Sequence, residues 1–203
     1  MTSMDRHGKR WLHLLLLNFL LIAALPQPAM ADLKQGIDAY EQADYATAFA
    51  QLKPAAELGV VEAQYRLALL YLHGNGVEKN ALTARLWLDR AVRQGDATAK
   101  SDLEALDASI KDFLQRSGMP ALTGGDGSST ETAIAFVGVK SEAAGVDAEH
   151  AVTSAFFPGW QWRSQALVQG PGNRPFDLIT MEKGGESRKL YFDITDWFGE
   201  MGN

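Results

Sequence analysis

The chain has 203 residues, of which 46% are hydrophobic and 22% charged, with 19 basic residues against 25 acidic ones. This composition is typical of a folded protein of one or two domains rather than a disordered one. The sequence contains no cysteine, which excludes disulfides, thiolate metal ligands, cysteine nucleophiles and lipid-modified cysteine anchors. The net acidic charge, with no basic stripe, argues against nucleic-acid binding, because neutralised phosphates supply most non-specific affinity.

Residues 1–31 have the three parts of a secretory signal peptide. Three basic residues lie within positions 6–10, a mostly apolar stretch covers residues 11–25, and Ala29-Met30-Ala31 forms an A-x-A cleavage motif. A membrane anchor is the alternative, but the apolar stretch is shorter than the roughly 20 residues that span a bilayer. We therefore expect cleavage after Ala31, a periplasmic or secreted protein, and no membrane insertion of the mature chain. The removed segment carries three basic residues and one acidic residue, so the mature chain has 16 basic and 24 acidic residues, a net charge of −8.

Residues 32–116 contain an internal repeat in which similar residues recur 36 positions apart, so that residues 55–59 align with residues 91–95. A period in the mid-thirties with two helices per unit is typical of an α-solenoid of antiparallel helix pairs. Asp44 and Asn80 are expected to cap the starts of corresponding helices, and Gly59 and Gly95 to follow their ends. From Asp96 onward, an apolar stripe predicts one longer helix, up to residue 116, which we expect to close the array.

The run from Ala63 to Asn80, followed by a Trp-Leu helix that ends in Gln94-Gly95, resembles one full repeat of the Sel-one-like family. This family is a class of tetratricopeptide-related repeats, and the resemblance covers residues 33–105. It implies packing or turn roles for the matching positions: Ala63, Tyr65, Leu67, Tyr71, Gly74, Gly76, Trp87, Ala91 and Gly95. Gly74 and Gly76 are expected to take positive φ, and Trp87 to pack between helices. A phosphate-binding loop at residues 73–76 is an alternative, but it lacks the lysine and the preceding strand.

Residues 117–129 are rich in glycine and serine and predict a flexible linker. Beyond them, residues 130–203 predict a short strand over 132–139, a helix over 141–157, and three further strands at 160–168, 176–181 and 190–194. Because of Gly145, the regular part of the helix is expected to start near Asp147. The predicted fold class is α+β with two domains: an α-solenoid, then a small α+β domain with an antiparallel sheet and one helix.

Two polar sets in residues 130–203 suggest catalysis or metal binding, but neither leads us to expect an enzyme. Asp147, His150 and Ser154 share one helix face, which suggests a nucleophile, base and orienter, yet no strained elbow or oxyanion motif accompanies them. Three acids near strand ends are candidates for a general acid–base pair or a metal site: Asp177, Asp193 and Asp196. Asp193 is expected to face solvent or to cap the next turn. We expect no catalytic residues, no cofactor and no metal.

The function predicted is that of an exported adaptor that binds a protein or peptide in the groove of its repeats. Gln64 and Arg66, on the first helix of the repeat, are candidates to contact the partner. Trp160 and Trp162 are also candidates, although a core position is favoured for them. The alternative is a small enzyme or an enzyme inhibitor, of the kind found in immunity proteins, with its active surface in residues 130–203.

Overall fold

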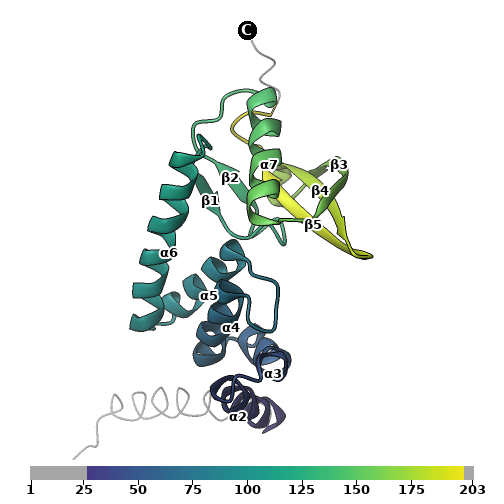
Figure 1. Cartoon of the computed structure of the whole chain (residues 1–203). Helices are drawn as coiled ribbons and strands as arrows, with labels where there is room; N and C mark the ends of the chain where they lie inside the picture. The colour runs from purple at the N-terminus through teal and green to yellow at the C-terminus, as the bar shows by residue number, and fades with distance from the viewer. Residues whose placement is uncertain (1–26, 199–203) are drawn as a thin grey trace, which may run out of the picture.

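The computed structural model describes residues 27–198 and contains a helical region followed by a sheet with one helix (Figure 1). The helices of the first region are α2 (Gln27–Glu41), α3 (Tyr45–Glu57), α4 (Val61–His73), α5 (Ala81–Arg93) and α6 (Ala97–Arg116). The second region has β1 (Leu122–Gly124), β2 (Ile134–Phe136), α7 (Glu142–Phe156), β3 (Gln161–Gln169), the short 3-10 helix η1 (Pro171–Asn173), β4 (Pro175–Lys183) and β5 (Glu186–Asp193). The basic and apolar parts of the predicted signal peptide lie outside the described residues, and its cleavage motif lies within α2.

The caps expected at the helix ends are confirmed. The Asp44 side chain accepts a hydrogen bond from the backbone N–H of Thr47 at 3.2 Å, and Asn80 accepts one from Thr83 at 2.9 Å. Gly59 and Gly95 take positive φ after α3 and α5. Because these signals are local, they fix where each helix begins and ends regardless of its packing partners.

Small residues let the helices of the repeat region approach closely. Five alanines on facing helices are fully buried: Ala48, Ala63, Ala84, Ala91 and Ala99. Leu67 is also fully buried, and Trp87 is 7% exposed. Gly76 has a φ of 67°, and a Cβ atom there would overlap the Tyr45 carbonyl oxygen, so the loop between α4 and α5 needs glycine at this position.

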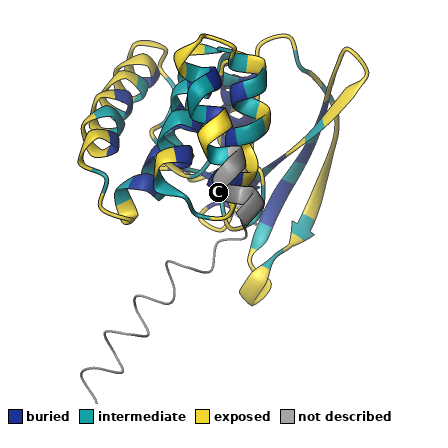
Figure 2. Cartoon of the chain, turned by 90° about the horizontal axis from the view of Figure 1, so that it is seen from below, coloured by how far each residue is buried: buried dark blue, intermediate teal, exposed yellow. Residues whose placement is uncertain are grey.

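The second region contains a five-stranded sheet in the order β1-β2-β5-β4-β3, with α7 packed on one face (Figure 1). The predicted strand–helix–three-strand order is confirmed, but the sheet is mixed rather than antiparallel, because β2 pairs in parallel with β5. The parallel pair forms because α7 carries the chain across the sheet between β2 and the hairpins. β3 lies at one edge and is exposed over most of its length (Figure 2).

Helix α7 begins at Glu142, so the prediction that its regular part starts near Asp147 is wrong. Gly145 lies inside the helix and is buried, because the Trp197 indole ring packs directly on it. A Cβ atom at residue 145 would lie 2.5 Å from the ring. The glycine that looks like a helix breaker is therefore a packing site for a large aromatic residue.

Residues 117–129 are not a segment without secondary structure, which corrects the predicted linker. They contain β1, which pairs with β2, and the buried residue Asp126. Asp126 accepts hydrogen bonds from Ser128 and, across the boundary, from the Thr83 hydroxyl of α5 at 3.2 Å. Leu82 of α5 belongs to the apolar core beneath α7. The segment is held between the two regions because β1 pairs with β2 on one side and Asp126 bonds to Thr83 of α5 on the other.

Candidate interaction groove

The first helices of successive repeat units are α4 and α6, and each carries a side-chain stripe; on α4 it holds Tyr65 and Leu72, two turns apart. On α6, Asp102, Leu106, Ser109 and Phe113 recur at helical spacing and share one face. The hydroxyl of Tyr65, on α4, donates a 2.9 Å hydrogen bond to Asp102 and joins the two stripes. Burial, followed by the Asp102 carboxylate, raises the pKa of Tyr65 to about 12, so this hydroxyl keeps its proton at neutral pH.

The surface formed by the stripes of α4 and α6, called the strip below, ends at its upper side in an apolar pocket. Residues of both regions line this pocket. The pocket has a volume of about 370 Å³, within the usual range for ligand sites. Leu72 of α4 and Leu106, Ile110 and Phe113 of α6 form one side, and Phe156 of α7 closes it. The Phe113 and Phe156 rings meet edge to face at 5.7 Å between centroids, and Phe113 is 39% exposed. A bulky apolar side chain of a partner would fit here.

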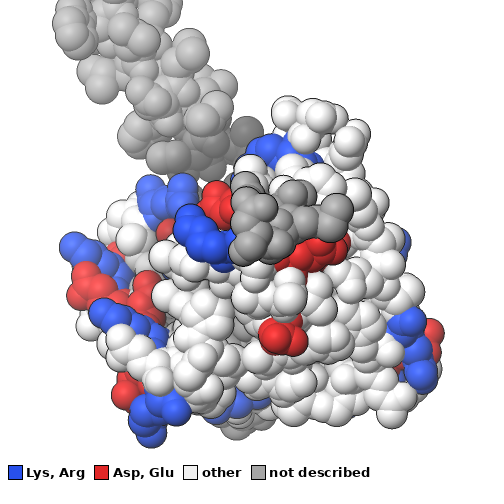
Figure 3. All heavy atoms as spheres, turned by 90° about the horizontal axis from the view of Figure 1, so that it is seen from above, with Lys and Arg blue, Asp and Glu red and all other residues white. Residues whose placement is uncertain are grey.

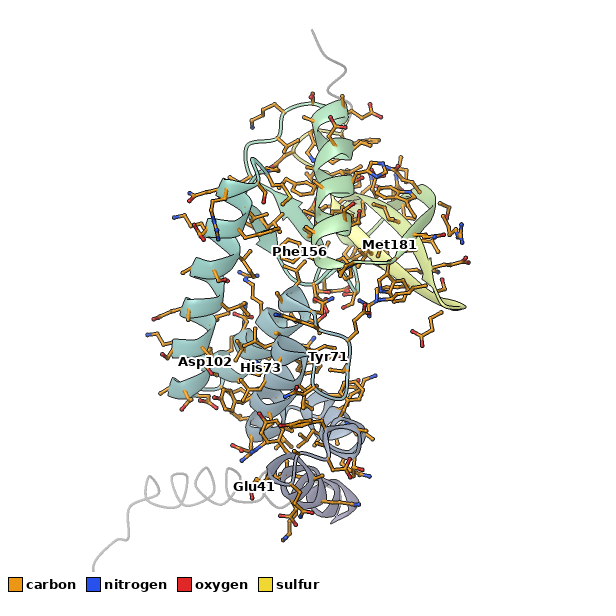
Figure 4. The ribbon with its side chains drawn as sticks, in the orientation of Figure 1. Glu41, Tyr71, His73, Asp102, Phe156 and Met181 are labelled. Carbon is orange, nitrogen blue, oxygen red and sulfur yellow. The ribbon has the colours of Figure 1, made fainter. Side chains whose placement is uncertain are left out.

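The lower end of the strip is polar and acidic. Arg66 lies 2.5 Å from Glu62 and 3.8 Å from Glu41, with its guanidinium over the Tyr40 ring. One cation therefore faces two carboxylates, and Asp102 has no ion-pair partner among the described residues. Figure 4 shows Asp102 beside the lower part of α6 and Phe156 higher up, at the level where α7 ends. We use the name interaction groove for the apolar pocket together with the side chains of α4 and α6 that lead from it to Asp102 and, through Arg66, to Glu41.

Gln64, predicted to contact a partner, is a structural residue, so that prediction is wrong. It is 4% exposed, donates a hydrogen bond to the Ala56 carbonyl, and accepts one from the Gln94 amide at 2.8 Å. Arg66 does lie in the groove, but its charge is engaged within the chain. Polarity on the sequence suggested exposure for Gln64, whereas the side chain instead satisfies a buried backbone carbonyl between helices.

Trp160 and Trp162 are half-buried and packed against the core of the second region, as the favoured interpretation predicted. The Trp160 indole donates to Glu78, in the loop between α4 and α5, and the Arg188 guanidinium lies over its ring at 4.8 Å. Trp162 stacks on His150 at 3.9 Å between ring centroids. Both rings have partners within the chain, which argues against Trp160 and Trp162 as partner-binding residues.

Glu78 connects the repeat loop to the sheet. It accepts from the Lys183 ammonium at 2.6 Å as well as from Trp160. Burial would raise the pKa of Glu78, but the bonds from Lys183 and Trp160 outweigh it and lower the pKa overall. Arg85 of α5 adds a second connection by donating to the Gly124 carbonyl at 2.7 Å. These contacts connect the repeat region to the sheet region.

The polar residues considered for catalysis do not come together at one site. Asp147, His150 and Ser154 are exposed on α7, and the His150 ring stacks on the Trp162 ring of β3. Asp193 pairs with Arg174 and accepts from the Thr195 N–H at 3.1 Å, so it caps the turn after β5 as expected. Asp196 lies in that turn and is exposed.

Asp177 is instead part of a buried acidic pair that the sequence did not indicate. It lies beneath α7 and accepts from the Gln165 amide at 2.7 Å, opposite Glu149, which is fully buried. Neither Glu149 carboxyl oxygen has a hydrogen-bond partner among the described residues. Burial, and then the nearby Asp177 carboxylate, raise the pKa of Glu149 to about 9; burial also raises that of Asp177. Glu149 is therefore protonated at neutral pH and inaccessible to a substrate.

Over residues 27–198, no helix has the length and apolar character required to cross a bilayer. Within the same part of the chain, no group of three or more histidine or acidic residues could hold a metal ion. On the face seen from above, positive and negative side chains are interspersed at the sides, and the middle is mostly uncharged with a few acidic side chains (Figure 3). This face has no basic stripe of the kind that binds nucleic acid.

Paired antiparallel helices with an offset of 36 residues, small residues at their contacts and a glycine-dependent loop define a helical-repeat protein. The Sel1 repeat family model matches residues 61–96, which are α4, the glycine loop, α5 and the turn after it. The chain therefore contains a Sel1 repeat, as the resemblance implied. No curated protein and no solved structure matches the chain.

Proposed function

We propose that this protein is an exported adaptor that binds a protein partner in the interaction groove. The observation that carries the proposal is the Sel1 repeat itself, because helical repeats of this kind present extended surfaces for protein binding. The groove along α4 and α6 supports it, since it joins a polar stretch to an apolar pocket with an exposed aromatic residue. Exposed apolar surface rimmed by polar residues is typical of interaction sites.

Export rests on the sequence of residues 1–31, with its basic start, apolar stretch and A-x-A motif. Production of the full chain in a bacterial host should give a periplasmic protein whose intact mass corresponds to an N-terminus at Asp32. A cytoplasmic product that still begins at Met1 would contradict this part of the proposal.

The adaptor function is tested by photocrosslinking in the cell that makes the protein. A photoreactive amino acid replaces Ser109, which lines the pocket, and in a matched control it replaces Ser164 on the exposed edge strand β3. The expected result is a discrete adduct with one protein from position 109 and none, or a different one, from position 164. Absence of any adduct from position 109, with the variant folded and exported, overturns the proposal.

A further inference from the structure

We propose that the interaction groove recognises an extended segment in which a basic side chain lies three residues away from a bulky apolar one. This inference rests on the proposed function and specifies the partner's chemistry. The apolar residue enters the pocket closed by Phe113 and Phe156, and the basic residue pairs with Asp102.

The charge of the groove selects the basic residue. At the lower end, the carboxylates of Glu41, Glu62 and Asp102 outnumber the single Arg66 cation. Asp102 is half-buried, and among the described residues its carboxylate accepts only from the Tyr65 hydroxyl and has no ion-pair partner, so acceptor positions remain free for a partner's cation. At the upper end, the pocket is lined by Lys79, which has no ion pair among the described residues and disfavours a second cation there. A partner with its positive charge on one side of the apolar residue fits both ends.

The spacing follows from helix geometry. Asp102 and the middle of the pocket at Ser109 lie on one stripe of α6, seven residues apart. At 1.5 Å per residue, these positions are separated by about 10.5 Å along the helix axis. An extended chain advances about 3.3 Å per residue, so it covers this distance in three residues. If the basic and apolar residues of the partner were one position apart, they would not reach from the pocket to Asp102. If they were six positions apart, the basic residue would lie beyond Asp102.

The composite origin of the pocket gives the proposal its specificity. Phe156 comes from α7, so a repeat region alone would lack one wall. Phe113 lies at the rim with 39% of its surface exposed, and its edge-to-face contact with Phe156 leaves the rest of its ring available for a partner side chain. Aromatic rings of this kind contribute large contact areas at protein interfaces.

The test uses the full mature chain and four synthetic peptides, capped at both ends and dye-labelled. Their cores are Arg-Ser-Ser-Phe, the reversed Phe-Ser-Ser-Arg, Ser-Ser-Ser-Phe and Glu-Ser-Ser-Phe. Fluorescence anisotropy should show that one of the two arginine peptides binds at least fivefold tighter than the serine peptide and at least tenfold tighter than the glutamate peptide. Equal affinity of the arginine and glutamate peptides, or no binding by any peptide, overturns the proposal.

Three variants locate the binding. Asp102→Asn keeps an acceptor for Tyr65 and should remove the advantage of arginine over serine while leaving the serine peptide unchanged. Phe113→Ser should weaken all the peptides tenfold or more, whereas Leu167→Ser, at another exposed apolar position on β3, should weaken none. Thermal melting of each variant checks that it is folded. Unchanged binding by Phe113→Ser overturns the proposal. If the crosslinked adduct from position 109 survives in the Asp102→Asn, Phe113→Ser double variant, the adaptor function stands and this assignment of the partner fails.

Discussion

Replacement of Glu149 by glutamine should stabilise the protein at neutral and alkaline pH. The carboxyl is fully buried beneath α7 without a hydrogen-bond partner, and burial, with the charge of Asp177, raises its pKa from 4.5 to about 9. Because the folded state holds this proton more tightly than the unfolded state, the side chain costs nothing below about pH 4.5 and increasingly destabilises the fold as the pH rises towards 9. At pH 7.5 the cost is three pH units at about 1.36 kcal/mol each, or about 4 kcal/mol.

Glutamine has nearly the same shape and does not titrate, so the variant should gain roughly 2–4 kcal/mol at pH 7.5 and almost nothing at pH 4.5. For a chain of this size that corresponds to an increase in melting temperature of about 5–15 °C. Urea unfolding from pH 4.5 to 9, followed by circular dichroism, measures the difference. The control is Glu186→Gln at an exposed position on β5. A Glu149→Gln variant that is less stable at pH 7.5, or a difference that stays constant with pH, would refute the reasoning.

Three further changes test packing and the connection between the regions. Gly145→Ala places a methyl group 2.5 Å from the Trp197 ring and should lower the free energy of unfolding by about 1–3 kcal/mol in urea titrations, and an unchanged midpoint would contradict that contact. Trp87→Ala deletes a large side chain that is 7% exposed and should lower it by about 3–5 kcal/mol; a loss below about 1 kcal/mol would show that the indole is not a packing residue. Glu78→Gln removes the charge that holds Lys183, so limited proteolysis should cut residues 117–129 several-fold faster than in Glu186→Gln, whereas equal rates would mean that this pair does not hold the regions together.

The helices of the repeat region could be predicted because their signals are local. Asp44 and Asn80 cap their helices, and the apolar stripe of α6 follows from its own sequence. Gln64 could not be placed the same way, since its partners, Ala56 and Gln94, come from other parts of the repeat. A polar residue on a helix gives the same pattern whether it faces solvent or spans a buried gap.

In the second region the sequence indicated the long strands and missed what depends on distant partners. β1 is only three residues long and ends in glycine, so nothing in its own composition distinguishes it from a turn. Gly145 alone suggests a break in the helix, and only its contact with Trp197, far away in sequence, explains why a glycine is needed there. Phe113 lay on the predicted apolar stripe and Phe156 at the predicted helix end. The contact between their rings depends on how α6 and α7 pack together, which the sequence does not show. The wall that Phe113 and Phe156 form together therefore could not be predicted from either segment alone.

The place of β5 in the sheet has a consequence for the order in which the protein can fold. β5 lies between β2 and β4 although it occupies residues 186–193, close to the end of the chain. As the polypeptide emerges with its N-terminus first, the repeat helices can form through contacts between near neighbours in sequence. One edge of β2 stays unpaired until residues 186–193 have been synthesised. During that interval the exposed apolar strand is open to wrong pairing, so a stalled or truncated chain would aggregate through β2 even when its repeats are already folded.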